Sequence, residues 1–197
     1  IHFGISTQTP IILEGTYGQG KFTALEYYCD IMNLEIKRIP ISNSTKVDDL
    51  LFKSILQKDK NGSSILKNSK TPLCEAIEYK GLFPETLIVI EGINNASPAI
   101  LELLNSIFGP KDTNILLPNG STITKGNINL VGIFYPSNDC TREKLPINLI
   151  NNCLYHIVEN PSENDIKQII KILFQKNNLK GKEIEVFTKN FLEEQKI

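Results

Sequence analysis

The sequence offers few residues suited to metal binding or redox chemistry. Its 197 residues include two histidines and four cysteines, and the cysteines are widely spaced with no Cys-x-x-Cys pair. Zinc sites and disulfide frameworks need such residues at short, regular spacing. The pattern therefore argues against both and favours a reducing compartment, the cytoplasm or the nucleus. The residues concerned are His2, His156, Cys29, Cys74, Cys140 and Cys153.

Long apolar runs and an excess of one charge are also missing. The longest apolar stretches, such as residues 87–90, fall far short of the roughly 20 residues that a membrane-spanning helix needs. The 21 Lys and Arg residues are balanced by 22 Asp and Glu residues, which gives a formal net charge of -1. No overall basic field attracts nucleic acid or an anionic membrane, so neither is expected as a partner.

The composition is that of a folded domain. The chain is 41% hydrophobic and 22% charged, which excludes a disordered segment and a coiled coil. Its length allows one domain, or one and a half, with a buried core. The chain begins with Ile1 and no signal-peptide pattern follows, so we expect a piece of a longer polypeptide.

Short apolar stretches alternate with helical patterns along the chain. This alternation predicts an α/β fold with a mainly parallel sheet and helices on both faces. Strands are expected at residues 10–14, 35–41, 87–90, 129–134 and 154–158. Helices are expected at residues 21–32, from Ser44 with a Ser/Thr cap, at 73–79, from Ser97, at 162–175 and at 182–195.

Two further segments connect these elements. Asn119-Gly120 stands between the strand-like residues 115–117 and 122–124, which predicts a hairpin. Residues 59–71 are polar and are expected to form an exposed excursion. The last two expected helices have no strands beside them, so they are interpreted as an added helical cap.

A glycine-rich loop follows the first expected strand and opens a helix. It has the pattern G-x-x-x-x-G-K, in which backbone N–H groups and the helix N-terminus surround phosphates and the lysine reaches the outer ones. The alternative is a strand–helix turn that binds nothing. The predicted nucleotide-binding residues are Gly15, Thr16, Tyr17, Gly18, Gln19, Gly20, Lys21, Phe22 and Thr23.

With these motifs in order, the chain resembles the AAA+ ATPase modules of the midasin and dynein-related group. The matching segments are residues 10–23, 41–51, 87–108, 115–124 and 129–134, and the run Lys144-Leu145-Pro146. The resemblance implies a P-loop fold with a five-stranded parallel sheet sandwiched by helices, a pre-sensor hairpin and a partial C-terminal helical lid. It also implies a large subdomain at residues 1–160, a lid that starts at 161–197, ATP or ADP as ligand, and sibling AAA+ modules of the same chain or ring as partners.

The sequence departs from the family at the metal and the catalytic base. Phe22 stands where the family has a Mg²⁺-binding Ser or Thr, and Thr23, turned by about 100° along the helix, should point away. Because Mg²⁺ demands oxygen ligands, Mg²⁺ is a doubtful cofactor. Glu91 aligns with the metal-binding Asp and is a weak candidate ligand, while Gly92 aligns with the catalytic Glu. A one-residue shift makes Glu91 the base but puts Ile90 at the metal position.

Two more polar positions are lost. Tyr135 aligns with the sensor-1 Asn, and Ile150 and Asn152 align with the arginines that approach the next subunit's phosphate; Arg142 does not fall at that position. No catalytic residue is therefore assigned, and the module is interpreted as a pseudoenzyme.

Three functions remain open. The first is a nucleotide-binding module that does not hydrolyse ATP and has a structural role in a ring. The second is a nucleotide-free scaffold, in which Tyr17 and Phe22 fill the site. The third is an active ATPase, rescued by Glu91 or by adjacent modules. Adenine contacts are expected from residues 2–9 and the helix after Pro161, whereas His156 and Cys29 are interpreted as structural.

Overall fold

The computed structural model describes residues 1–58, 64–117, 120, 122–136 and 145–176. The chain divides into two compact units, Ile1–Val158 and Glu159–Ile197, and each is described by itself. The expected helix at residues 182–195 lies outside the described residues.

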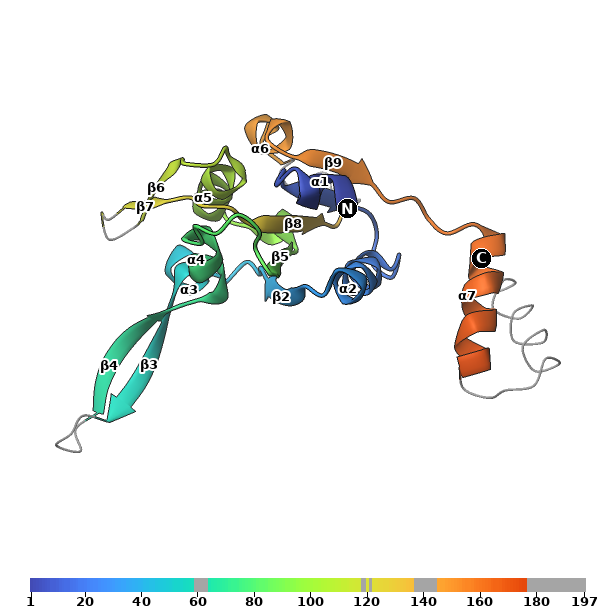
Figure 1. Ribbon diagram of the computed structural model, residues 1–197, viewed down its shortest axis with the longest axis horizontal. Coiled ribbons are helices and arrows are strands. Elements are labelled where there is room, and N and C mark those ends of the chain that lie inside the picture. Colours follow the sequence, from blue (N-terminus) through green and yellow to red (C-terminus); the bar gives the residue numbers. More distant parts are fainter. Residues whose placement is uncertain (59–63, 118–119, 121, 137–144, 177–197) are drawn as a thin grey trace. The chain divides into compact units, whose positions relative to one another are not determined.

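The helices and strands follow the alternation expected from the sequence (Figure 1). The strands are β1 (Ile11–Glu14), β2 (Glu35–Pro40), β3 (Phe52–Lys58), β4 (Ser64–Lys70), β5 (Thr86–Glu91), β6 (Asn114–Leu116), β7 (Thr122–Thr124), β8 (Asn129–Phe134) and β9 (Leu154–Ile157). The helices are α1 (His2–Ser6), α2 (Lys21–Met32), α3 (Val47–Leu51), α4 (Pro72–Ile77), α5 (Pro98–Phe108), α6 (Ile147–Asn151) and α7 (Glu163–Lys176), with a short 3-10 turn at Ile93–Asn95.

A five-stranded sheet forms the centre of the first unit. Its strand order is β2-β5-β8-β1-β9, and each neighbouring pair is parallel. Parallel strands need crossover connections, and the helices supply them. The predicted parallel sheet, with all five of its strands, is confirmed.

Both faces of the sheet are covered by helices, since its inner strands carry apolar residues that point to either face. Successive side chains of a strand point to opposite faces. In β5, Ile88 and Ile90 pack with α3, α4 and α5, while Leu87 and Val89 pack with α2. All four side chains are fully buried. The sandwich of helices around the sheet is therefore confirmed.

Two antiparallel hairpins stand outside the sheet. The pair β6–β7 is the predicted hairpin, with Ile115 opposite Ile123. The pair β3–β4 was not predicted: part of the segment 59–71, expected only to be an exposed excursion, forms β4 and pairs with β3 from Phe52↔Lys70 to Lys58↔Ser64. Backbone pairing holds such a hairpin together without the apolar alternation from which strands are recognised.

The helix expected from Ser44 begins three residues later, so the predicted Ser/Thr cap is wrong. The Thr45 hydroxyl instead accepts a hydrogen bond from the backbone N–H of Ser42 at 2.9 Å. The first residue before α3 is Lys46, whose N–H donates to the Asp49 carboxylate at 3.2 Å. Asp49 thus accepts from the N–H of the residue before the helix, whereas a capping hydroxyl would accept from an N–H inside the first turn.

The helix starts predicted at Ser97 and Ser162 are confirmed. Ser97 precedes α5, and its hydroxyl accepts from the N–H of Ile100 at 3.4 Å. Ser162 and Asp165 bond reciprocally at the start of α7, through Ser162 N–H to the Asp165 carboxylate at 2.9 Å and Asp165 N–H to the Ser162 hydroxyl at 3.2 Å. The second pair is a capping arrangement of the reciprocal kind.

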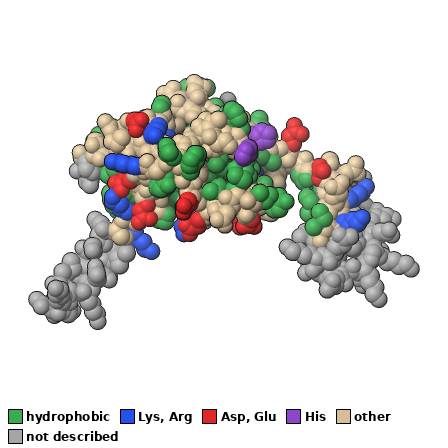
Figure 2. All heavy atoms as spheres, in the orientation of Figure 1, with side chains coloured by type: hydrophobic (Ala, Val, Ile, Leu, Met, Phe, Trp, Pro, Cys, Tyr) green, Lys and Arg blue, Asp and Glu red, His purple; other side chains and the backbone are tan. Residues whose placement is uncertain are grey.

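The surface of the first unit carries charges of both signs. Figure 2 shows acidic and basic side chains interspersed with apolar ones on the face in view. Among the described residues, no helix has the length and apolar character that a membrane crossing requires.

The packing of α5 against the sheet yields a stability prediction. Leu104 is fully buried, whereas Leu82 is 74% exposed. Replacing a buried leucine by alanine removes apolar contacts and leaves a cavity, so Leu104→Ala should lower the free energy of unfolding by about 2–5 kcal/mol. Leu82→Ala is the control and should change it by no more than about 0.5 kcal/mol. Urea denaturation of both variants measures the difference, and equal effects would contradict the described core.

Candidate functional site

The predicted phosphate loop connects the end of β1 to the start of α2. Gly18 and Gly20 adopt left-handed backbone conformations, with φ of 81° and 76°. A side chain added at either position would meet nothing within 4 Å, so both glycines border open space. A loop that keeps left-handed glycines beside open space and runs into a helix N-terminus fits an anion.

Lys21 lies at the centre of the site. Its side chain is 5% exposed, and its ammonium group donates to the carbonyl oxygens of Gly15 at 2.7 Å and Thr16 at 2.5 Å. Burial lowers the pKa of Lys21, and the negative charge of Glu91 opposes that shift. The lysine is therefore held against its own loop by neutral acceptors, which an incoming anion can replace.

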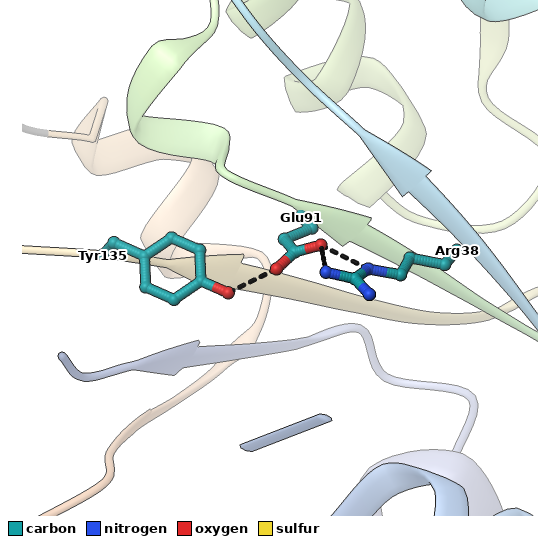
Figure 3. A network of polar contacts seen from close by, with 3 residues as sticks. All are labelled: Arg38, Glu91 and Tyr135. Atoms are coloured by element: carbon teal, nitrogen blue, oxygen red, sulfur yellow. Dashed lines mark hydrogen bonds and ion pairs between the residues drawn. The ribbon is translucent and has the colours of Figure 1, made fainter. Parts of the chain in front are cut away.

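Glu91 ends β5 and is bonded on both carboxylate oxygens. One oxygen accepts from Nε and Nη2 of Arg38, and the other accepts from the Tyr135 hydroxyl at 2.5 Å (Figure 3). The hydrogen bond from Arg38 is the largest cause of the lowered pKa of Glu91. Burial and the bond to Glu91 raise the pKa of Tyr135, so Tyr135 remains a donor and Glu91 an acceptor at neutral pH.

Aromatic rings lie beside the charged side chains of the site. The rings of Tyr17 and Tyr135 stack with centroids 3.8 Å apart and an angle of 10° between their planes. The Lys21 ammonium lies 4.7 Å from the Tyr135 ring centroid, and Cζ of Arg38 lies 4.7 Å from the Phe22 ring centroid. The two cations are therefore each paired with an aromatic face.

The structure brings most of the sequence-predicted positions together. Tyr17, Lys21, Phe22, Glu91 and Tyr135 form one connected cluster at the carboxyl ends of β1, β5 and β8. Parallel strands place their carboxyl ends at one edge, which is where ligands of open α/β sheets bind.

Asn152 lies elsewhere. It borders a cavity of about 530 Å³ together with Thr9 and Pro10, which precede β1 and so lie at the opposite end of that strand from the loop. Arg142 lies outside the described residues. The position that aligns with the family's arginines is thus separated from the phosphate loop of its own module.

A second cavity, of about 500 Å³, adjoins the loop. Lys21 and Gly20 line it from one side, and residues 1, 3 and 4 and the β9 residues Tyr155 and His156 line it from others. Residues 3 and 4, which belong to the segment 2–9 from which adenine contacts are expected, are part of this lining. His156 is exposed on β9, the edge strand of the sheet.

Sequence reasoning missed two residues of the site, Arg38 and Tyr155. Arg38 belongs to β2, and the alternating pattern of that strand marked it only as a polar position. Tyr155 donates from its hydroxyl to the Glu14 carboxylate at the end of β1. No local motif marks either pair, because their partners are far apart in sequence.

The described residues do not fit a magnesium ion. Phe22 offers no oxygen ligand, Thr23 is exposed, and both oxygens of Glu91 already accept hydrogen bonds. No group of three or more His, Cys, Asp or Glu side chains able to hold a metal occurs in the part of the chain that the structure describes.

Comparison with known proteins identifies the family. Residues 10–145 match the family described as AAA domain, dynein-related subfamily. The chain belongs to this subfamily of AAA domains. Midasin of Giardia intestinalis is 26% identical over 170 residues, a match that covers 85% of this chain and 3% of midasin. The domain is therefore an AAA+ ATPase domain of the dynein and midasin group, and the predicted resemblance is confirmed.

Two solved structures share its fold. One is a presumed ATPase of Cytophaga hutchinsonii, with a TM-score of 0.61 and 16% identity over 85% of this chain and 47% of that one. The other is the P216G mutant of RuvB from Thermotoga maritima, with a TM-score of 0.60 and 15% identity over 91% and 50% of the two chains. At these identities the likeness concerns the fold, and the predicted fold class is confirmed.

The conformation of Gly92 yields a prediction for this edge of the sheet. Gly92 has a φ of 76°, and an added Cβ would lie 3.1 Å from the Ile41 carbonyl oxygen. Gly92→Ala should therefore destabilise the fold by more than the roughly 1–2 kcal/mol of a left-handed L-residue alone. Gly120→Ala is the matched control, because Gly120 has a φ of 80° and open space around it. Thermal unfolding compares them, and an equal loss would contradict the crowding at Gly92.

Proposed function

We propose that this domain binds ATP or ADP, does not hydrolyse it, and acts as a structural member of a ring of AAA+ modules. Support for binding comes from the open glycine loop, the buried Lys21 and the adjoining cavity of about 500 Å³. Gly15 to Lys21, with Phe22 and Thr23, are the proposed nucleotide-binding residues. Residues 1–160 would be the large subdomain and 161–197 the start of the lid.

The hydrogen bonds that the Glu91 carboxylate already accepts are the main observation in support of a loss of hydrolysis. A general base must accept a proton from water, and a metal ligand must offer a free oxygen lone pair in the right place. Both oxygens of Glu91 instead accept from Arg38 and Tyr135. Gly92, at the family's catalytic position, has no side chain to take over, and a positioned general base is worth about 10²–10⁴-fold in rate.

The proposed partners are sibling AAA+ modules. The match to midasin covers 3% of that protein, which supports a single module of a long chain. Asn152, where the family has an arginine, would face the neighbouring module's nucleotide and contribute no charge there. A cytoplasmic or nuclear location goes with this proposal.

One observation favours a second candidate, the nucleotide-free scaffold. The Tyr17 ring stacks on Tyr135 beside Lys21, and Lys21 bonds its own loop. Tyr17 is nevertheless 70% exposed, so it can move without opening the core. Neither ring lines the cavity of about 500 Å³ beside Lys21, so the stack does not fill it.

Binding is tested by isothermal titration of the chain with ATP and with ADP. We expect saturable binding with a Kd below about 1 mM, and a loss of about 10–100-fold in affinity in Lys21→Ala, because a charge-assisted hydrogen bond is removed. Lys37→Ala, which removes an ammonium group paired with Glu35, is the control and should bind as the parent chain does. Absence of binding in the parent chain would favour the scaffold.

Hydrolysis is tested by single-turnover measurement with radiolabelled ATP. We expect no turnover above the buffer rate, since Phe22 offers no metal ligand, Gly92 offers no base, and the Glu91 carboxylate is held by Arg38 and Tyr135. Turnover that disappears in Glu91→Gln would support the active ATPase instead and would reject the proposed role of the Arg38 and Tyr135 contacts.

A further inference from the structure

We propose that the Arg38 guanidinium replaces the magnesium ion of this site, so that the nucleotide is bound without a metal. The inference rests on the proposed nucleotide binding and assigns Arg38 as a binding residue for the phosphate tail. Its ligand class is a metal-free nucleoside di- or triphosphate.

The position of Arg38 is the first argument. The two residues that align with the family's metal ligands are Phe22 and Glu91. The guanidinium of Arg38 contacts both of them: Cζ lies 4.7 Å from the Phe22 ring centroid, and Nε and Nη2 donate to the Glu91 carboxylate (Figure 3). A built-in cation thus bridges the two positions between which the family holds its ion.

Competition for Glu91 is the second argument. A Mg²⁺ ion bound by Glu91 would have to displace Arg38 or lie beside its positive charge. Either arrangement would raise the free energy of Mg²⁺ binding. A displaced guanidinium loses its acceptor, and a guanidinium that stays in place repels the ion. The Glu91 side chain is only 14% exposed, so solvent offers little compensation for the lost contact.

The unused donors of Arg38 are the third argument. A guanidinium has five N–H donors in a planar fork. Glu91 engages Nε and Nη2, and within the described part of the chain Nη1 has no partner. The Arg38 side chain is 52% exposed, so these donors are open to a ligand. Phosphate oxygens are acceptors that match such a fork.

Phe22 fits this arrangement better than the family's hydroxyl would. A ring face stabilises a guanidinium beside it, and Phe22 also packs against the core beneath α2. The phenyl ring that replaces the hydroxyl and the position of Arg38 are therefore linked, because the ring of Phe22 stabilises the guanidinium of Arg38.

The experiment compares ATP affinity in excess EDTA with that in Mg²⁺, by isothermal titration of the full chain. We expect Kd values that agree within about twofold. Arg38→Gln should weaken metal-free binding by about tenfold or more, because a charged donor set is lost. Lys37→Gln, one residue earlier on β2, is the matched control and should leave both affinities unchanged.

A double variant tests the exchange of cations directly. Arg38→Gln combined with Phe22→Ser frees Glu91 and adds a hydroxyl at the family position, so ATP binding should become Mg²⁺-dependent. If Arg38→Gln fails to fold, Arg38→Lys keeps the charge but loses the fork, and it should still weaken metal-free binding by several-fold, on the order of threefold to tenfold.

The outcomes separate the two proposals. Binding by the parent chain only in Mg²⁺ overturns the role of Arg38 and leaves nucleotide binding intact. No binding in either buffer overturns the nucleotide proposal, and this inference with it. Folded Arg38 variants that bind metal-free ATP as tightly as the parent chain also overturn the inference.

Discussion

Glu91 is the last residue of β5, whose four inner residues are buried, and its carboxylate accepts hydrogen bonds on both oxygens from Arg38 and Tyr135. A carboxylate has a limited number of lone pairs, and each one taken by the protein is unavailable to a metal or a water. Because of this constraint, Tyr135 and Arg38 act together on one group, the Glu91 carboxylate. Tyr135, in place of an amide, supplies the donor that fixes one oxygen, and Arg38 supplies the charge that fixes the other.

The parallel sheet explains why these residues meet. Arg38 comes from β2, Glu91 from β5, Tyr135 follows β8, and the loop that ends in Lys21 follows β1. The order β2-β5-β8-β1 brings the four strands side by side, so their carboxyl ends share one edge of the sheet. The apolar layers on both faces hold that edge in place, and changes in its polar residues leave the fold intact.

Sequence patterns predicted the parts of this molecule that depend on local spacing. The apolar run of β5, the glycine loop and the cap at Ser97 follow from residue types at fixed distances. The hairpin β3–β4 was missed because backbone pairing, not apolar alternation, defines it. Arg38 was missed for a different reason: its partner Glu91 lies 53 positions away, and only the pairing of β2 with β5 brings the two together.

The charges at the site favour the binding of a phosphate tail without a metal. Lys21 and Arg38 contribute two positive charges and Glu91 one negative charge, which leaves a net charge of about +1 at neutral pH. Lys21 already donates to two neutral carbonyl oxygens. Exchange of these acceptors for phosphate oxygens gives stronger, charge-assisted bonds. The same exchange favours the charged form of a lysine whose pKa burial lowers. The two cations therefore have complementary roles. The buried Lys21 would form stronger hydrogen bonds with the phosphate than with its own loop, and the half-exposed Arg38 would bind the phosphate from the solvent side.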